Sequence, residues 1–210
     1  MHNRDQPFEI AVRNKSSLTD YAVRVGVRAV NLQMRYDFAP IWGQDLTVEF
    51  DNRPEKMDWI VDIVDKPTLE GAAGWHTIDE FGRVISEVAV ETGLSWTMIL
   101  SHEVLECAGN ASVAKYARNW RDGFTYALEV CDAVQATMYR IEGVSVSDFV
   151  WPQWFDAALG YRTAQSSHNR NLQPFEIARG GYAPRYTRDW RDATVGASAL
   201  PFHDRLRYLG

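Results

Sequence analysis

The stretch LSHEVLECAGN, residues 100–110, places one imidazole and two carboxylates in a segment that otherwise has the composition of a core helix. At about 100° per residue, His102 and Glu106 share one face of a helix, and Glu103 lies about 100° from His102. Apolar residues take up much of the remaining circumference, which predicts a buried helix. Because desolvating a charge costs several kcal/mol, the three polar groups must meet a metal ion, fixed hydrogen bonds or water.

The spacing H-E-x-x-E can be interpreted as a metal site. His102 and Glu106, at positions i and i+4, can bind one ion, and Glu103 can reach a metal-bound water, as in H-E-x-x-H zinc sites. A carboxylate at the fifth position is an accepted zinc ligand, although its charge weakens the acidification of the water. The alternative is a hydrogen-bonded core histidine beside two solvated glutamates. The pattern by itself does not exclude that alternative.

A third ligand has to come from another segment, and YALEVCDAV, residues 126–134, is the best source. Glu129 and Asp132 lie there in an apolar context. On a regular strand they point to opposite faces, so only one can meet the helix. A bulge or strand end at Cys131 would let both reach it. His76, in GWHTIDE, is a further candidate, but we favour a position in a surface loop for it.

Composition excludes several classes of protein. The 210 residues are 46% hydrophobic and 24% charged, as in an ordinary globular protein, and are enough for one well-cored domain. The net charge of -6 does not favour nucleic-acid binding. Cys107 and Cys131 are too few for a disulfide scaffold. We see no apolar leader and no run of membrane-spanning length, so we expect synthesis in the cytoplasm and no membrane partner.

The order of the predicted elements is that of an α+β fold. A capping box at Ser17 and Asp20 predicts a first helix with the apolar stripe Leu18, Tyr21, Ala22, Val25, Ala29 and Leu32, which ends before Pro40. Alternation predicts three strands, which begin at Leu46, Trp59 and Val84.

The helix of residues 100–110 begins after Gly93, with Ser95 as its N-cap and Gly109 as a C-terminal cap. A strand from Phe124 and a hairpin with Glu142-Gly143 as its turn follow.

The C-terminal part differs in charge and pattern. From Pro152 to Gly210 there are eight Arg, no Lys and five acids, with little periodicity. We therefore divide the chain into an α+β domain, residues 1–156, and an Arg- and aromatic-rich irregular arm, residues 157–210. Such an arm wraps the domain or binds a neighbour, through protein contacts or self-association. QPFEIA occurs at 6–11 and again at 173–178, by coincidence or because the two termini pair.

Several of these stretches together resemble a family. SHEVLE, followed by YALEVCD, VSVSDFVWPQWFD and GGY, resembles the zincin-like proteins of bacterial and phage genomes that combine an H-E-x-x-E helix with a downstream E-x-x-D element. MRYDFAPIWG is similar to theirs as well. One stretch departs from the family: its members follow the second glutamate with Asp-Pro, and this chain has CAGNASVAK.

The resemblance implies a fold and a chemistry. The fold would be zincin-like, with an N-terminal helix and a mixed sheet packed on the metal-binding helix. His102 and Glu106 would be zinc ligands, Glu103 the general base, and Glu129 or Asp132 the third ligand. Another divalent metal is an alternative to zinc.

Two hypotheses follow from the resemblance. The first is a zinc-dependent hydrolase, most simply a peptidase with a peptide or protein substrate. The second is a catalytically inert structural or assembly protein of a phage particle, associated with the virion through residues 157–210. A likeness of fold does not by itself decide the activity.

Overall fold

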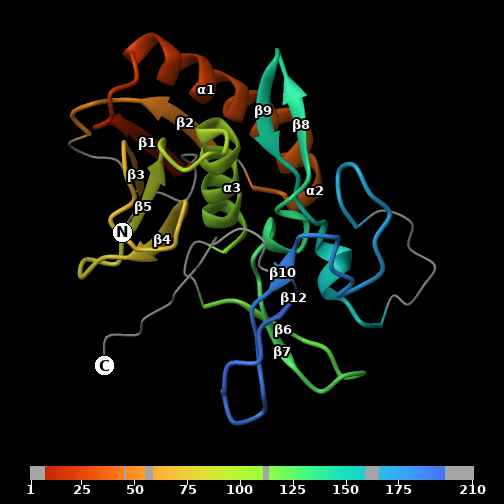
Figure 1. Cartoon of the computed structure of the whole chain (residues 1–210). Helices are drawn as coiled ribbons and strands as arrows, with labels where there is room; N and C mark the ends of the chain where they lie inside the picture. Colours follow the sequence, from red (N-terminus) through yellow and green to blue (C-terminus); the bar gives the residue numbers. More distant parts are fainter. Residues whose placement is uncertain (1–7, 45, 55–58, 111–113, 159–165, 197–210) are drawn as a thin grey trace.

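The molecule is built around a five-stranded mixed sheet (Figure 1). The computed structural model describes residues 8–44, 46–54, 59–110, 114–158 and 166–196. The strand order is β2-β1-β3-β5-β4, with the bounds β1 Phe8–Asn14, β2 Leu46–Phe50, β3 Trp59–Val64, β4 Gly74–Ile78 and β5 Val84–Ala89. Together with the helices, this confirms the α+β class and the three strands predicted by alternation.

The sheet is parallel except at one edge. β1 pairs in parallel with β2 and β3, β3 pairs in parallel with β5, and β4 runs antiparallel to β5. The sequence analysis missed β1 and β4. In β1, Ile10, Ala11 and Val12 are all fully buried, so the strand is covered on both faces and has no alternation to detect.

The repeated QPFEIA does not join the chain ends. Its first copy runs into β1, whose neighbours in the sheet are β2 and β3. The described residues of the second copy, 173–178, form turns and coil. Of the two alternatives, the described residues therefore favour coincidence over pairing.

The first helix, α1 (Asp20–Gln33), starts two residues later than a Ser17 cap would place it. Its N-cap is Thr19, whose hydroxyl accepts a hydrogen bond from the Ala22 N–H at 3.2 Å. The predicted stripe is wrong at Tyr21 and Val25, which are 78% and 37% exposed, and right at Ala29, which is buried. The face that packs inward is rotated by about one residue and holds Val23, Gly26, Val27, Ala29, Val30 and Gln33.

α1 ends at Gln33, before Pro40 as predicted, but the helical path goes on beyond it. It continues from α1 through a π-helical turn, Met34–Phe38, into the short helix α2, Ala39–Trp42. Pro40 lies in the first turn of α2, where the missing N–H of proline costs little. The Phe38 ring stacks on Trp42 and meets Phe149 edge-on, with ring centroids 5.7 and 5.2 Å apart. These ring contacts fix the turn to the core.

The helix α3 (Trp96–Gly109) lies between the sheet and the β8–β9 hairpin and contacts β4, β5, β9 and α1 (Figure 1). Every residue from Thr97 to Gly109 is buried, as the all-round apolar pattern predicted. The helix begins after Ser95 as expected, but the Ser95 hydroxyl contacts Thr97 and does not cap the backbone. Asn110, and not Gly109, is the C-cap.

The hairpin predicted after α3 is also confirmed. β8 (Met138–Ile141) pairs with β9 (Val144–Ser147), and the turn residues Glu142 and Gly143 both have positive φ, 49° and 83°. Two positive φ angles give the turn that matches the twist of a hairpin.

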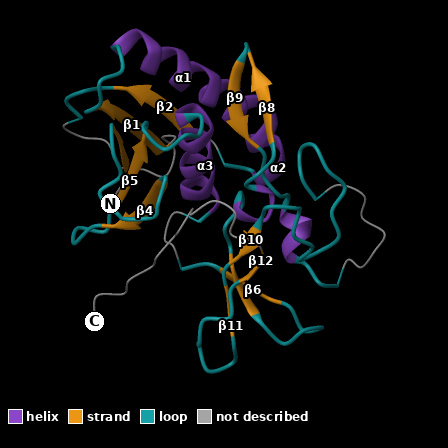
Figure 2. Cartoon of the chain, viewed as in Figure 1, coloured by secondary structure: helices purple, strands orange, loops and turns teal. Residues whose placement is uncertain are grey.

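The remaining strands are short and lie in a part of the molecule that is mostly loop (Figure 2). They are β6 Tyr116–Arg118, β7 Thr125–Ala127, β10 Tyr182–Ala183, β11 Arg185–Tyr186 and β12 Val195–Gly196. The strand predicted from Phe124 thus ends at Ala127. The chain then enters a 3-10 turn, η2 (Asp132–Val134); a second one, η3, spans Pro152–Phe155.

Much of the arm lies along the domain. β11 pairs with β7, and a second apolar cluster combines Leu172, Ala178 and Ala183 with Tyr126 and Trp154. Residues 159–165 and 197–210 of the arm are outside the described residues. Among the helices in the described ranges, none has the length and apolar composition needed to cross a membrane.

Candidate metal centre

Six ionisable side chains from three segments of the chain meet at α3. The helix supplies His102, Glu103 and Glu106, β4 supplies His76, and the chain after β7 supplies Glu129 and Asp132. Each of the six is at most 4% exposed. The structure therefore brings together all five residues that the sequence analysis selected, and it adds His76.

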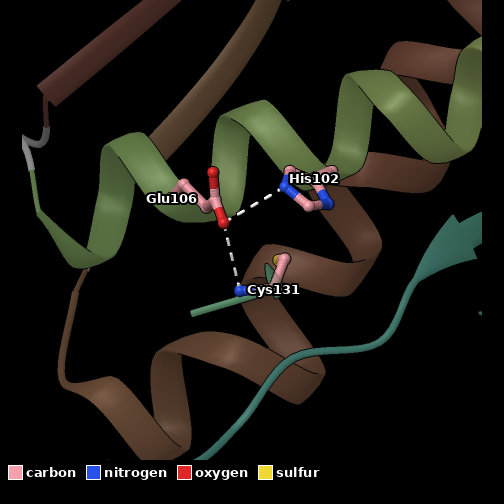
Figure 3. A group of neighbouring side chains, drawn as sticks. All are labelled: His102, Glu106 and Cys131. Atoms are coloured by element: carbon pink, nitrogen blue, oxygen red, sulfur yellow. Dashed lines mark hydrogen bonds and ion pairs between the residues drawn. The ribbon is translucent and has the colours of Figure 1, made fainter. Parts of the chain in front are cut away.

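One side of the cluster is organised around His102. Its Nε2 lies 3.1 Å from Glu106 Oε1 and 3.4 Å from Asp132 Oδ1. The backbone N–H of Cys131 donates to the same Glu106 oxygen at 3.3 Å. Figure 3 shows His102 and Glu106 on α3 with Cys131 beside them. The donor atoms of these three side chains all lie within 4.8 Å of one another, so the Cys131 thiol belongs to this side of the cluster.

The other side is organised around His76. Its Nδ1 lies 3.0 Å from Glu103 Oε2 and 3.9 Å from Glu106 Oε2. Its Nε2 lies 4.0 Å from Glu129 Oε2. The surface-loop position predicted for His76 is wrong, because the residue pairs with Ser86 in the sheet and is 4% exposed. The signal available in the sequence was the pair of segments GWHTI and VISEV around a turn, which forms the β4–β5 hairpin.

Both candidate third ligands reach the cluster because the strand is short. β7 ends at Ala127, and the chain turns into η2 at Asp132. A strand end does let Glu129 and Asp132 both approach, but it lies at Ala127 and not at Cys131, where the sequence analysis placed it. Their roles as ligands stay predictions.

A glycine makes room for the cluster on β4. A Cβ added at Gly74 would lie 2.6 Å from Glu103 Oε1 and 2.6 Å from Ile99 Cγ2. Real Cβ atoms do not approach other heavy atoms so closely, so any larger residue would displace Glu103 or the helix. The edge strand and α3 can lie this close only because residue 74 is glycine.

The charges of the cluster do not balance within it. Four carboxylates carry -4, and two imidazoles carry +2 when both are protonated, which leaves -2 in the least negative ionised state. Buried charge of one sign is costly unless a counter-ion compensates it. A divalent cation supplies that compensation, and imidazole and carboxylate are zinc ligands.

The distances around His102 also suit an ion. Ligands about 2.1 Å from a zinc ion lie about 3.4 Å apart in tetrahedral geometry. The Nε2 of His102 is 3.1 and 3.4 Å from the two carboxylate oxygens that it faces. Each of these two distances suits a shared ion, and the described donors that lie within 4.8 Å of one another on this side are those of His102, Glu106 and Cys131.

The thiols contribute in a different way. Neither Cys107 nor Cys131 forms a disulfide, and both are buried. Burial raises the pKa of the Cys131 thiol well above its usual value, and Asp132, Asp148 and Glu103 raise it further. Without a bound cation this thiol is protonated at neutral pH.

The loop after α3 is held by Asn110, the C-cap of the helix. Its side-chain oxygen accepts a hydrogen bond from the Lys115 N–H at 2.9 Å, and Lys115 Nζ donates to Gly109 O at 3.0 Å. Residues 111–113 lie outside the described residues. Asn110 therefore ties down the loop that follows the helix, at a distance of four residues from Glu106 along the chain.

A surface groove lies away from this centre. It is formed by α1 and β2, and Arg24, Arg28 and Phe50 are among its lining residues. None of the six clustered side chains lines it. The centre and the groove are separate features of the molecule.

Comparison with models of protein families, with curated proteins and with solved structures finds no match to this chain. The geometry of the site is therefore the basis for assigning a function, and the likeness to zincins stays a hypothesis.

Proposed function

We propose that this protein is a metal-dependent hydrolase of zincin-like fold, most simply a peptidase, whose zinc ion is held by His102, Glu106 and Asp132. The observation that carries the proposal is the buried cluster of two imidazoles and four carboxylates beside α3. Asp132 is chosen over Glu129 as third ligand because its carboxylate faces the His102 Nε2 at 3.4 Å, whereas Glu129 faces His76. Another divalent metal with the same ligand preferences is the alternative to zinc.

The side chains would divide the chemistry. A zinc ion in this position lowers the pKa of a bound water and polarises a carbonyl group. Glu103, next to His102 on α3, takes the proton from that water. His76 holds Glu103 in place through the 3.0 Å contact, and the Cys131 N–H orients Glu106.

A second candidate function is favoured by burial. All the ligand groups are at most 4% exposed, as in structural metal sites that are closed to substrate. In this reading the protein is a catalytically inert assembly protein of a phage particle. It would bind protein neighbours or itself through residues 157–210.

Metal content and hydrolysis test the first candidate together. Elemental analysis of the full chain should find zinc or another divalent metal. Glu103→Gln should keep the ion at His102 and abolish hydrolysis of a denatured protein substrate. Glu87→Gln is the matched control, because Glu87 is also buried but is bonded to Thr68 outside the cluster. Equal hydrolysis by wild type and Glu103→Gln would remove Glu103 from the reaction.

Sedimentation tests the second candidate. Arg188 and Arg191 lie on the exposed surface of the arm. Replacing both with Ala should weaken self-association at low salt if the arm is a docking surface. If the full chain and the double variant both sediment as monomers and neither binds a phage assembly partner, the docking hypothesis fails. Truncation is the poorer test, since it removes Leu172 and Ala183 from the second core cluster.

A further inference from the structure

Glu106 faces both histidines of the cluster, each with a different oxygen. Oε1 lies 3.1 Å from His102 Nε2, and Oε2 lies 3.9 Å from His76 Nδ1. A carboxylate whose two oxygens point at two separate imidazoles has the geometry of a bridge between two ions. We propose that the protein binds a second divalent cation, held by His76 Nδ1, Glu103 Oε2 and Glu106 Oε2, so that Glu106 bridges two ions.

The distances around His76 satisfy the geometric requirement for a shared ion. Two donors at about 2.1 Å from one ion are about 3.0 Å apart when adjacent in octahedral geometry, and at most about 4.2 Å apart. His76 Nδ1 is 3.0 Å from Glu103 Oε2 and 3.9 Å from Glu106 Oε2. The three donor atoms also lie within 4.8 Å of one another.

The charge of the whole cluster favours two ions over one. Four carboxylates with neutral imidazoles carry -4, so a single divalent ion leaves -2 in a buried site. Two divalent ions bring the sum to zero. Four carboxylates and two histidines are also the donor set of di-iron and di-manganese carboxylate centres, although those are built on a four-helix bundle. The likeness is therefore one of donor chemistry alone.

The surroundings of His76 are those of a metal-bound histidine. Its second nitrogen, Nε2, faces Glu129 Oε2 at 4.0 Å, which is too long for a hydrogen bond but puts a carboxylate on the side to which a metal-bound histidine usually directs its other ring N–H. This assigns Glu129, which the first ion does not use, as the residue that orients His76. Gly74 keeps the edge strand close enough for His76 and Glu103 to meet.

This inference rests on the proposed function, whose ion at His102 it keeps, and it changes the role of Glu103. In the one-ion site, His76 holds Glu103 by a hydrogen bond and Glu103 accepts a proton. In the two-ion site, Glu103 is a ligand, and two ions share the activation of water, as in hydrolases whose ions lie about 3.5–4 Å apart.

The stoichiometry of bound metal tests the inference on the full chain. Wild type is loaded with Mn²⁺, freed of unbound ion by gel filtration and analysed for metal and protein. We expect about two ions per chain. His76→Ala should lower this to about one, while His168→Ala, which changes an exposed histidine outside the cluster, should leave it at two.

Electron paramagnetic resonance of the loaded wild type keeps the test independent of how well the variants fold. Two Mn²⁺ ions bridged by Glu106 should give an exchange-coupled spectrum in place of the six-line signal of an isolated ion. One ion per chain would overturn the second site and leave the proposed function standing. Two uncoupled ions would also overturn it, because the second would then lie elsewhere. No bound ion would overturn both proposals.

Discussion

The two long helices have the same length and opposite surroundings. α1 and α3 each span 14 residues and contact each other, with the Trp96 ring of α3 packed where Gly26 of α1 has no side chain. α1 keeps its charged side chains at the surface. α3 is buried from Thr97 to Gly109 and carries its charged groups inward.

The difference shows what apolar packing cannot explain. The one buried polar side chain of α1, Gln33, is neutral and donates hydrogen bonds to Tyr139 Oη and Ser147 O, at 3.0 and 2.7 Å. The polar groups of α3 are ionisable and meet other carboxylates and imidazoles. Hydrogen bonds suffice for a buried amide, whereas a group of buried carboxylates needs positive charge.

We expect the largest loss of stability from a substitution on the face of α3 that points away from the cluster. Leu100 is fully buried and lies about 200° around the helix from His102. Leu100→Ala should lower the free energy of unfolding by about 2–5 kcal/mol, because it leaves a cavity. Leu32→Ala on α1, where the side chain is half-buried, is the control and should cost less than about 1 kcal/mol. Equal losses in chemical denaturation would contradict the contrast between the helices.

Gly74→Ala tests the close approach of β4 to α3. The new methyl would meet Glu103 and Ile99, so we expect a loss of about 1–3 kcal/mol from overpacking. Because Glu103 must also shift, metal content measured in the same sample should fall. Wild-type stability in this variant would show that the two elements are farther apart than the structure places them.

A smaller effect distinguishes the two faces of α1. Val30 is fully buried and Val25 is 37% exposed. Val30→Ala removes two buried carbons and should cost about 1.6 kcal/mol at ~0.8 kcal/mol each. Val25→Ala should change stability by less than about 0.5 kcal/mol. The reverse order would restore the stripe that the sequence predicted.

The smallest effect concerns the two cysteine thiols. Here the reactivity of the thiols is measured, and not the free energy of unfolding. Cys107 and Cys131 are both buried and form no disulfide, and burial raises the pKa of the Cys131 thiol. A thiol reagent should therefore label neither in the native protein at neutral pH. After denaturation it should label both. Fast labelling of native Cys131 would mean that the cluster is open to solvent.

Local sequence patterns correctly predicted the features that are determined by residues close together in the chain. The limits of α3 and the turn at Glu142-Gly143 follow from periodicity and turn chemistry, and the H-E-x-x-E spacing placed His102, Glu103 and Glu106 correctly on α3. Glu129 and Asp132 were found as carboxylates in an apolar segment, and the structure brings both to the cluster.

The missed features depend on distant contacts. β1 became a central strand only because β2 and β3, more than thirty residues away, pair with both its edges. His76 belongs to the cluster because β4 pairs at the sheet edge beside α3. β4 was missed because Gly74 and Trp75, at its start, do not give the alternation that predicts a strand. Thr19 caps α1 in place of Ser17, and packing against the core buries a face about one residue from the predicted one.

The central claim is that a cation stabilises the cluster, and Glu106→Gln tests it most directly. With a chelator present, the variant should be at least as stable as wild type, because it removes one buried negative charge. With zinc at 100 times its Kd, wild type should gain about 2.7 kcal/mol and the variant much less, so the order of stabilities reverses. Chemical denaturation of both proteins under both conditions measures this. A wild type indifferent to zinc and chelator, with a variant less stable in each, would contradict the claim.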